Sequence, residues 1–133
     1  MTRSASNPGG DDWQGGLAAR YPLARSVWFE CFGGWFPILA HLLKRLESAV
    51  AQLPAARRRD FKVEQIRQKF GCLIVRLSHE GTPDMQAAID EAQSATNVTC
   101  EVCGAPGQLA DRRGWTSVKC SRHENWTRFD DLA

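Results

Sequence analysis

The sequence predicts an α+β protein in which a helix, a β-hairpin and a second helix form a body that precedes a small zinc-binding lobe. Apolar residues recur with the period of an amphipathic helix over residues 37–53 and with the period of a strand over residues 72–77. Near the C-terminus, three cysteines and one histidine have the spacing of a metal site. We expect residues 1–16 to be a flexible tail, residues 17–97 the body and residues 98–133 the lobe.

The length and composition suit this plan. The chain has 133 residues, of which 43% are hydrophobic, which is enough for one modest core and a lobe that a metal stabilises. No apolar run approaches the roughly 20 residues that span a bilayer, and the N-terminus has no apolar signal segment. Five cysteines, three of them in the metal pattern, suit a reducing compartment. We therefore predict a cytoplasmic protein without a membrane segment, in which Cys31 and Cys72 are buried free thiols.

The first helix of the body is predicted from Pro37 to Leu53. Its apolar residues follow the spacing of one helical face, and Pro37 suits the first helical position. Pro54 ends the run. We expect Trp35 to pack over the start of this helix. The predicted inward-facing residues are Leu39, Leu42, Leu43, Leu46, Val50 and Leu53.

A β-hairpin and a second helix complete the predicted body. Residues 61–70 mix a strand pattern with some helical character, and apolar residues alternate over 72–77 after Gly71. We pair these two segments as a hairpin. Thr82 and Pro83 then have the chemistry of a helix start. This helix should extend to about Ala95, with the inward-facing residues Met85, Ala88, Ile89 and Ala92.

The metal pattern consists of Cys100 and Cys103, followed after residues 104–119 by Cys120 and His123. Two residues between ligands allow one tight turn to aim both side chains at a single point, and two such pairs supply the tetrahedral ligand set of Zn²⁺. All four positions are used. We therefore predict one structural Zn²⁺ and no open coordination position of the kind that a catalytic zinc needs.

The residues around the ligands predict how the lobe folds. Residues 108–111 and 115–119 can pair across a turn at residues 112–114. Ser121 precedes Glu124 with the spacing of a capping box, which predicts a helix that begins at the second ligand pair. This order is that of a treble clef. A zinc ribbon, with a second knuckle in place of the helix, is the alternative.

Two groups of arginines are candidate partner contacts. They are Arg57, Arg58 and Arg59 after the first helix, and Arg112 and Arg113 at the tip of the lobe hairpin. Arginine forms forked hydrogen bonds to carboxylates and phosphates. For the first group, we favour a solvated loop between helix and strand over a contact with nucleic acid. The net charge of +2 is weak, whereas duplex-binding proteins typically carry a larger clustered excess.

Three motifs resemble one protein family. They lie at residues 34–37 (Gly-Trp-Phe-Pro), 63–71 (Val-Glu-Gln-Ile-Arg-Gln-Lys-Phe-Gly) and 100–107 (Cys-Glu-Val-Cys-Gly-Ala-Pro-Gly), the last followed by Gly-Trp and a cysteine. This ordered set resembles a family of small uncharacterised bacterial and phage proteins with GW(Y/F)P, QIKEKFGGLRF and CEVCGxPG…GW…C motifs. The sequence departs from the pattern at Cys72, where a glycine is usual, and at residues 74–75, where Arg-Phe is common. The resemblance implies occurrence on mobile elements and no particular activity.

The function that we favour is a non-enzymatic zinc-binding protein that acts by binding a macromolecular partner, most readily a protein. The closed zinc site and the five tryptophans fit it, because exposed tryptophan is a typical interface anchor. Among these tryptophans, we expect Trp35 and Trp115 to be buried. The phage members of the resembling family suggest an inhibitor of host defence, such as an anti-CRISPR protein, as a special case.

Two alternative functions stay open. A nucleic-acid-binding zinc-finger regulator would use the same arginines on phosphates. An HNH-like nuclease would need a histidine base and an open metal position. His79 with Glu80 could supply the base, but a surface loop is the simpler interpretation of this pair. We therefore predict no enzymatic activity and no catalytic residues.

Overall fold

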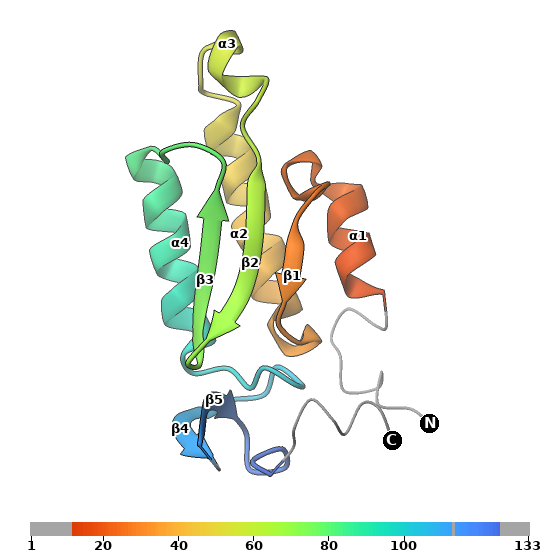
Figure 1. Cartoon of the computed structure of the whole chain (residues 1–133), viewed down its shortest axis with the longest axis vertical. Coiled ribbons are helices and arrows are strands. Elements are labelled where there is room, and N and C mark those ends of the chain that lie inside the picture. The colour runs from red at the N-terminus through yellow and green to blue at the C-terminus, as the bar shows by residue number, and fades with distance from the viewer. Residues whose placement is uncertain (1–11, 113, 126–133) are drawn as a thin grey trace.

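The computed structural model describes residues 12–112 and 114–125 and has an α+β architecture with two small sheets (Figure 1). The α+β prediction is confirmed. In chain order, the elements are α1 (Trp13–Arg20), η2 (Pro22–Ala24), β1 (Trp28–Glu30), η3 (Gly33–Trp35), α2 (Phe36–Val50), α3 (Ala55–Arg58), β2 (Val63–Lys69), β3 (Cys72–Leu77), α4 (Pro83–Thr96), β4 (Gln108–Arg112) and β5 (Trp115–Lys119).

The predicted hairpin forms the larger part of the first sheet, whose strand order is β1-β2-β3. Strands β2 and β3 pair antiparallel, with Ile66 opposite Val75. Phe70 and Gly71 form the turn, and both have positive φ (53° and 79°), as a two-residue turn of matching twist requires. Strand β1 adds to β2 in parallel. Sequence reasoning missed β1 because three residues are too few to show a period.

Helices α2 and α4 cover one face of this sheet (Figure 1). The residues predicted to face inward are buried in one core, from Leu39 to Leu53 and from Met85 to Ala92. Helix α2 ends at Val50, earlier than predicted, because the N–H groups of Gln52 and Leu53 donate to the carbonyls three residues back (3.1 and 2.9 Å), which tightens the chain into turns. The side chain of Thr82 caps α4, accepting a hydrogen bond from the Met85 N–H (3.3 Å).

The prediction of a flexible tail over residues 1–16 is wrong for residues 13–16, because helix α1 begins at Trp13. The side chain of Trp13 is only 5% exposed, and its ring meets the Phe29 ring edge-on at 5.3 Å. Two glycines lower the helix propensity of this segment. Burial of Trp13 and Leu17 supplies the stabilisation that propensity does not. Residues 1–11 lie outside the described residues.

The second sheet is the predicted hairpin of the lobe. Strands β4 and β5 pair antiparallel, with Leu109 opposite Val118. The lobe packs against the end of the body through the Gly34-Trp35 motif. Trp35 is fully buried, as predicted, and its Nε1–H donates to the carbonyl of Thr99 (2.9 Å). The N–H of Gly34 donates to the carbonyl of Glu101 (2.9 Å).

The close approach of the two parts explains why a glycine precedes Trp35. A Cβ atom at Gly34 would collide with the backbone of Cys100 and Glu101. The body therefore positions the first ligand pair directly. Among the described residues, no helix has both the length and the apolar character that crossing a membrane requires.

Candidate metal centre

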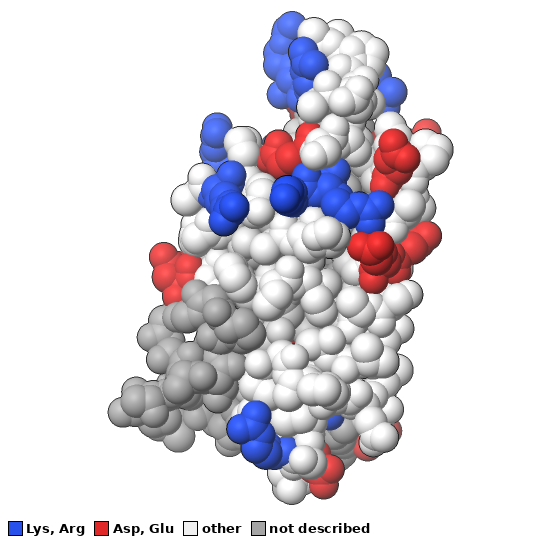
Figure 2. All heavy atoms as spheres, turned by 180° about the vertical axis from the view of Figure 1, so that it is seen from behind, with Lys and Arg blue, Asp and Glu red and all other residues white. Residues whose placement is uncertain are grey.

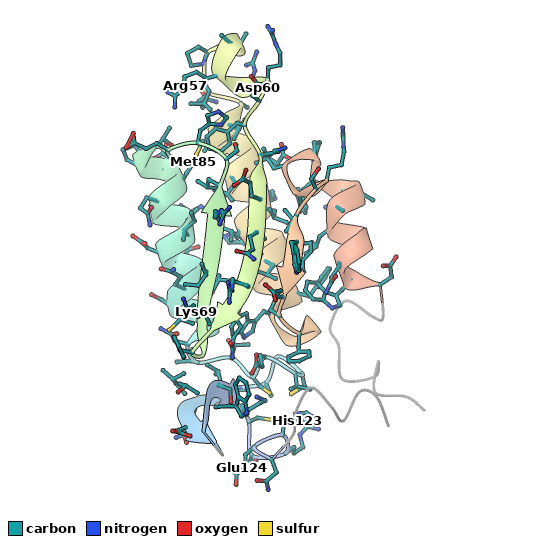
Figure 3. All side chains as sticks on the ribbon, viewed as in Figure 1. Arg57, Asp60, Lys69, Met85, His123 and Glu124 are labelled. Carbon is teal, nitrogen blue, oxygen red and sulfur yellow. The ribbon has the colours of Figure 1, made fainter. Side chains whose placement is uncertain are left out.

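The four predicted ligands come together in the lobe, where Figure 3 labels His123. Their candidate donor atoms all lie within 4.8 Å of one another. Cys100 and Cys103 lie in the loop after α4, and Cys120 and His123 follow β5. The structure thus confirms a three-cysteine, one-histidine cluster that could hold one metal ion.

Two tight turns aim the ligands at one point. In the first turn, the N–H of Gly104 donates to the carbonyl of Cys100 (2.9 Å), and Gly104 has a positive φ of 84°. A side chain would be strained in this backbone region. In the second turn, the N–H of His123 donates to the carbonyl of Cys120 (3.1 Å). In each turn, two residues between ligands suffice to bring both donors to the same side.

The distances between donors match a tetrahedral site. The sulfurs of Cys103 and Cys120 lie 3.7 Å apart, and the Nδ1 of His123 lies 3.2 Å from the Cys120 sulfur and 3.7 Å from the Cys100 sulfur. A zinc–sulfur bond of about 2.3 Å implies a tetrahedron edge of roughly 3.8 Å. The donor set and its spacing therefore fit Zn²⁺, with Nδ1 as the histidine ligand atom.

The surroundings of the thiols favour the thiolate form at Cys120. Burial raises the pKa of this thiol, but hydrogen bonds from the His123 ring, the Arg122 N–H and the neighbouring thiols outweigh burial and lower the pKa to about 6. Burial raises the pKa of Cys103. The Nη2 of Arg122 donates to the Cys103 sulfur (3.7 Å). Because three thiolates and Zn²⁺ carry a net charge of −1, this guanidinium would offset the excess.

A buried ion pair supports the ligand loop, and sequence reasoning missed it. The Nζ of Lys119 lies 2.8 Å from Oε1 of Glu101, and their side chains are only 7% and 3% exposed. The N–H of Glu101 also donates to the carbonyl of Val118 (3.0 Å). The pair therefore links the first ligand turn to β5. One feature of the sequence could have indicated this pair: Glu101 follows Cys100 and Lys119 precedes Cys120, so the clustering of these cysteines also brings the two charged residues close together.

The helix predicted to begin at Ser121 does not begin there, because residues 121–125 form turns. The hydrogen bond from His123 to Cys120 closes a turn over the positions where the first helical residues were expected. Residues 126–133 lie outside the described residues. The treble clef and the zinc ribbon therefore both stay predictions.

The first predicted group of arginines lies at the opposite end of the molecule from the lobe hairpin. Arg57, Arg58 and Arg59 lie at the α3 end of the molecule, where basic side chains gather in Figure 2, while β4 and β5 lie at the other end (Figure 1). Arg58 and Arg59 line a hollow at this end, and Arg57 is not part of its lining. The side chains of Arg112 and Arg113 lie outside the described residues.

The candidate nuclease pair makes no mutual contact. The Nδ1 of His79 lies 2.8 Å from the hydroxyl of Ser78, and its ring lies 5.9 Å from the Phe61 ring. In the described part of the chain, no hydrogen bond joins His79 to Glu80. Absence of enzymatic activity stays a prediction.

The prediction that Trp115 is buried is wrong, because its side chain is 74% exposed. A two-stranded sheet leaves more of its surface uncovered than a sheet that packs under helices. The predicted free thiols Cys31 and Cys72 are unpaired but only half-buried. Burial, aided by the Glu101 carboxylate, raises the pKa of Cys31 to about 12, so this thiol is a poor nucleophile.

Comparison with protein families, curated proteins and solved structures found no match for this chain. The resemblance of its three motifs to bacterial and phage proteins stays a prediction. The metal cluster and the exposed surface therefore provide the basis for assigning a function.

Proposed function

We propose that this chain is a non-enzymatic zinc protein that acts by binding a protein partner through apolar side chains at the junction of its two hairpins. The supporting observation is the exposure of Phe70 (71%), Leu109 (45%) and Trp115 (74%). We name these three residues the junction patch. Large exposed apolar side chains that lie close together, as Phe70 and Leu109 do beside Gly71, are typical of interaction sites.

The β2–β3 hairpin and the β4–β5 hairpin are in contact near the patch residues. The Nε2 of Gln68 donates to the carbonyl of Thr116 (3.4 Å), and a Cβ atom at Gly71 would collide with the side chain of Leu109. The β2–β3 turn that carries Phe70 therefore lies against the strands that carry Leu109 and Trp115. This contact brings the Phe70 turn next to Leu109, whereas the register of β4 with β5 places Trp115 on the opposite face of the lobe hairpin from Leu109.

Phe70 supports the proposal because local structure does not favour phenylalanine there. Its φ of 53° belongs to the left-handed region, which glycine and asparagine adopt with less strain. Its side chain gains little from the core, being 71% exposed. A strained residue without a packing role motivates a functional hypothesis, and an aromatic anchor on a fixed turn loses little entropy on binding.

In this proposal the metal has a structural role. Zn²⁺ would bind Cys100, Cys103, Cys120 and His123, and so would hold β4 and β5 against the body. All four residues are used as ligands, which favours a structural over a catalytic ion. The narrower proposal of a phage inhibitor of host defence, such as an anti-CRISPR protein, rests on the motif resemblance alone.

Affinity capture with the tagged, zinc-loaded chain tests the proposal. Phe70→Asn removes the ring and keeps a residue that tolerates positive φ, and Trp115→Ala removes the second anchor. Trp28→Ala is the matched control, because Trp28 is 66% exposed but lies on β1. We expect nuclease-treated lysate of the host to yield a protein that the wild type and Trp28→Ala retain and that the two patch variants lose. Capture that nuclease abolishes, or that the patch variants leave unchanged, would contradict the proposal.

A further inference from the structure

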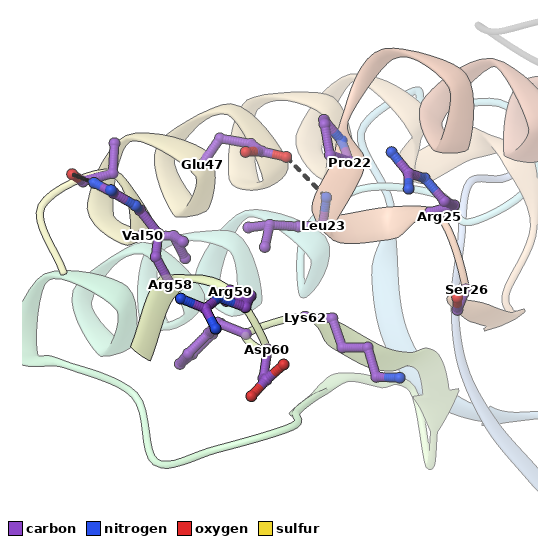
Figure 4. Close-up of a pocket in the computed structure, with 12 residues that line it drawn as sticks. Pro22, Leu23, Arg25, Ser26, Glu47, Val50, Arg58, Arg59, Asp60 and Lys62 are labelled. Carbon is purple, nitrogen blue, oxygen red and sulfur yellow. Dashed lines mark hydrogen bonds between the residues drawn. The ribbon is translucent and has the colours of Figure 1, made fainter. Parts of the chain in front are cut away.

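A hollow with a volume of about 570 Å³ lies at the α3 end of the molecule, away from the zinc lobe (Figure 4). Its walls come from η2 and the residues after it, from the C-terminal half of α2, and from residues 58–62. Its volume is within the range of roughly 300–1,000 Å³ that is usual for small-molecule sites. The hollow is therefore large enough to hold a small molecule.

The floor of the hollow is apolar. Leu23, Val50 and Phe61 line it, and all three belong to the main core, with exposed fractions of 5%, 6% and 6%. The core therefore fixes the floor. These three side chains give the hollow an apolar base, while most of its exposed lining is polar.

The rim is rich in cations. Arg25, Arg58, Arg59 and Lys62 line the hollow, against the carboxylates of Glu47 and Asp60. The N–H of Leu23 donates to Oε2 of Glu47 (2.8 Å), as Figure 4 shows, and this bond offsets part of that carboxylate's charge. Within the described residues, none of the four cations forms an ion pair. The rim thus offers a positive excess that the protein itself does not neutralise.

Hydrogen bonds hold parts of the rim in place. The Nη1 of Arg58 donates to the carbonyl of Ala51 (3.3 Å), and the other N–H groups of this guanidinium stay available. The backbone of Lys62 is held from both sides by Ser78, whose hydroxyl accepts from the Lys62 N–H (2.9 Å) and whose N–H donates to the Lys62 carbonyl (2.8 Å). A backbone fixed in this way loses little freedom when a ligand binds.

We infer that this hollow binds an oxyanionic group, a phosphate or a carboxylate, carried by a small molecule. Arginine binds both groups through charge-assisted, forked hydrogen bonds, and the unpaired cations of the rim supply such donors. The apolar floor accommodates the non-polar part of the ligand. The hollow and the junction patch lie on different elements, so the assignment does not depend on the proposed protein partner.

Titration of the full-length, zinc-loaded chain by ¹H–¹⁵N NMR tests the assignment. The probes are inorganic phosphate and succinate, added separately at constant ionic strength. We expect saturable shifts of the Leu23, Phe61 and Lys62 amides with at least one probe. The probe that saturates identifies the group as phosphate or carboxylate, and the absence of saturation with both overturns the assignment.

The neighbouring arginines provide matched variants. Arg58→Gln and Arg59→Gln each remove one rim cation and should raise the Kd about tenfold, the effect of losing one charge-assisted hydrogen bond. Arg57→Gln makes the same change of charge on the same short helix, but Arg57 does not line the hollow, so its Kd should stay within about twofold. Equal weakening by Arg57→Gln and Arg59→Gln would mean a general charge effect and would overturn the assignment.

Discussion

The body and the lobe bury their residues in different ways. In the body, α1, α2, α4 and the three-stranded sheet enclose one continuous apolar core. Among the described residues of the lobe, the apolar cluster has Cys100, Val102 and Cys120 as buried members, two of which are proposed metal ligands, and Val118 on β5 is buried as well. Where the body uses leucine, the lobe uses thiols and a buried ion pair. This difference predicts that the body is stable through packing alone, whereas the lobe depends on a metal ion bound to its cluster.

The largest expected effect is loss of the metal. We expect one zinc per purified chain, and none after Cys103→Ser, because serine does not supply a thiolate. Structural zinc contributes on the order of 10 kcal/mol in small zinc domains. Chelation should therefore unfold the lobe and spare the body. Hydrogen exchange should show that residues 108–119 lose protection while residues 39–50 keep it.

Elemental analysis provides the first check, and a chain without zinc or with two zinc ions would contradict this prediction. Cys72→Ser is the matched control, since Cys72 is half-buried on β3 and lies outside the cluster. It should leave the zinc content unchanged. Simultaneous loss of protection in both segments on chelation would mean that the body and the lobe form one cooperative unit.

The next largest effect is expected at the buried ion pair. Lys119→Met removes the cation that lies 2.8 Å from the buried Glu101 carboxylate, which should cost roughly 3–5 kcal/mol. Replacing both partners, as Lys119→Met with Glu101→Leu, should restore much of the loss, because a well-packed apolar pair avoids the desolvation of two charges. Urea unfolding of the zinc-loaded protein measures both variants. A single variant as stable as the wild type would show that the pair contributes little.

The sequence predicts a part of the fold well when the pattern that specifies this part lies within one short segment of the chain. The leucines of α2 and the spacing of the three cysteines and the histidine are local patterns, and the structure confirms the burial of the leucines and the clustering of the four metal-ligand candidates. The parallel pairing of β1 with β2 depends on residues far apart in the chain, and three residues carry no period. The burial of Trp13 likewise depends on Phe29.

Sequence reasoning missed the Glu101–Lys119 pair and misjudged Trp115 for a related reason. Charged side chains such as Glu101 and Lys119 are usually exposed to solvent, and an aromatic residue in a strand is usually packed against other side chains. Only the packing of β5 against the ligand turn buries Lys119, and only the small size of its sheet leaves Trp115 exposed. The hollow was predictable in part, since Arg58 and Arg59 were candidates, but its apolar floor depends on tertiary packing.

The smallest expected effect concerns the contact between the two parts. Gly34→Ala places a methyl group against the backbone of Cys100 and Glu101. Backbone atoms cannot move aside as the end of a flexible side chain could. The lobe must shift, which should destabilise the protein by about 1–3 kcal/mol. The hydrogen bond from Gly34 to Glu101 (2.9 Å) should weaken as well. Thermal unfolding of the zinc-loaded chain measures the loss, and exchange of the Gly34-position amide reports the contact itself.

Gly16→Ala is the matched control for this change, because a Cβ atom at Gly16 meets nothing within 4 Å and the residue lies in helix α1. Alanine there should stabilise the protein by about 1 kcal/mol through its higher helix propensity. The two substitutions add the same methyl group. Changes of opposite sign in the free energy of unfolding would therefore separate the steric clash at Gly34 from the general effect of replacing glycine by alanine. If Gly34→Ala were neutral, the lobe would have room to move on the body, and the metal rather than the contact would hold its ligands together. If it also lowered zinc affinity, the contact with the body would help to shape the site, and the two regions would differ less than their cores suggest.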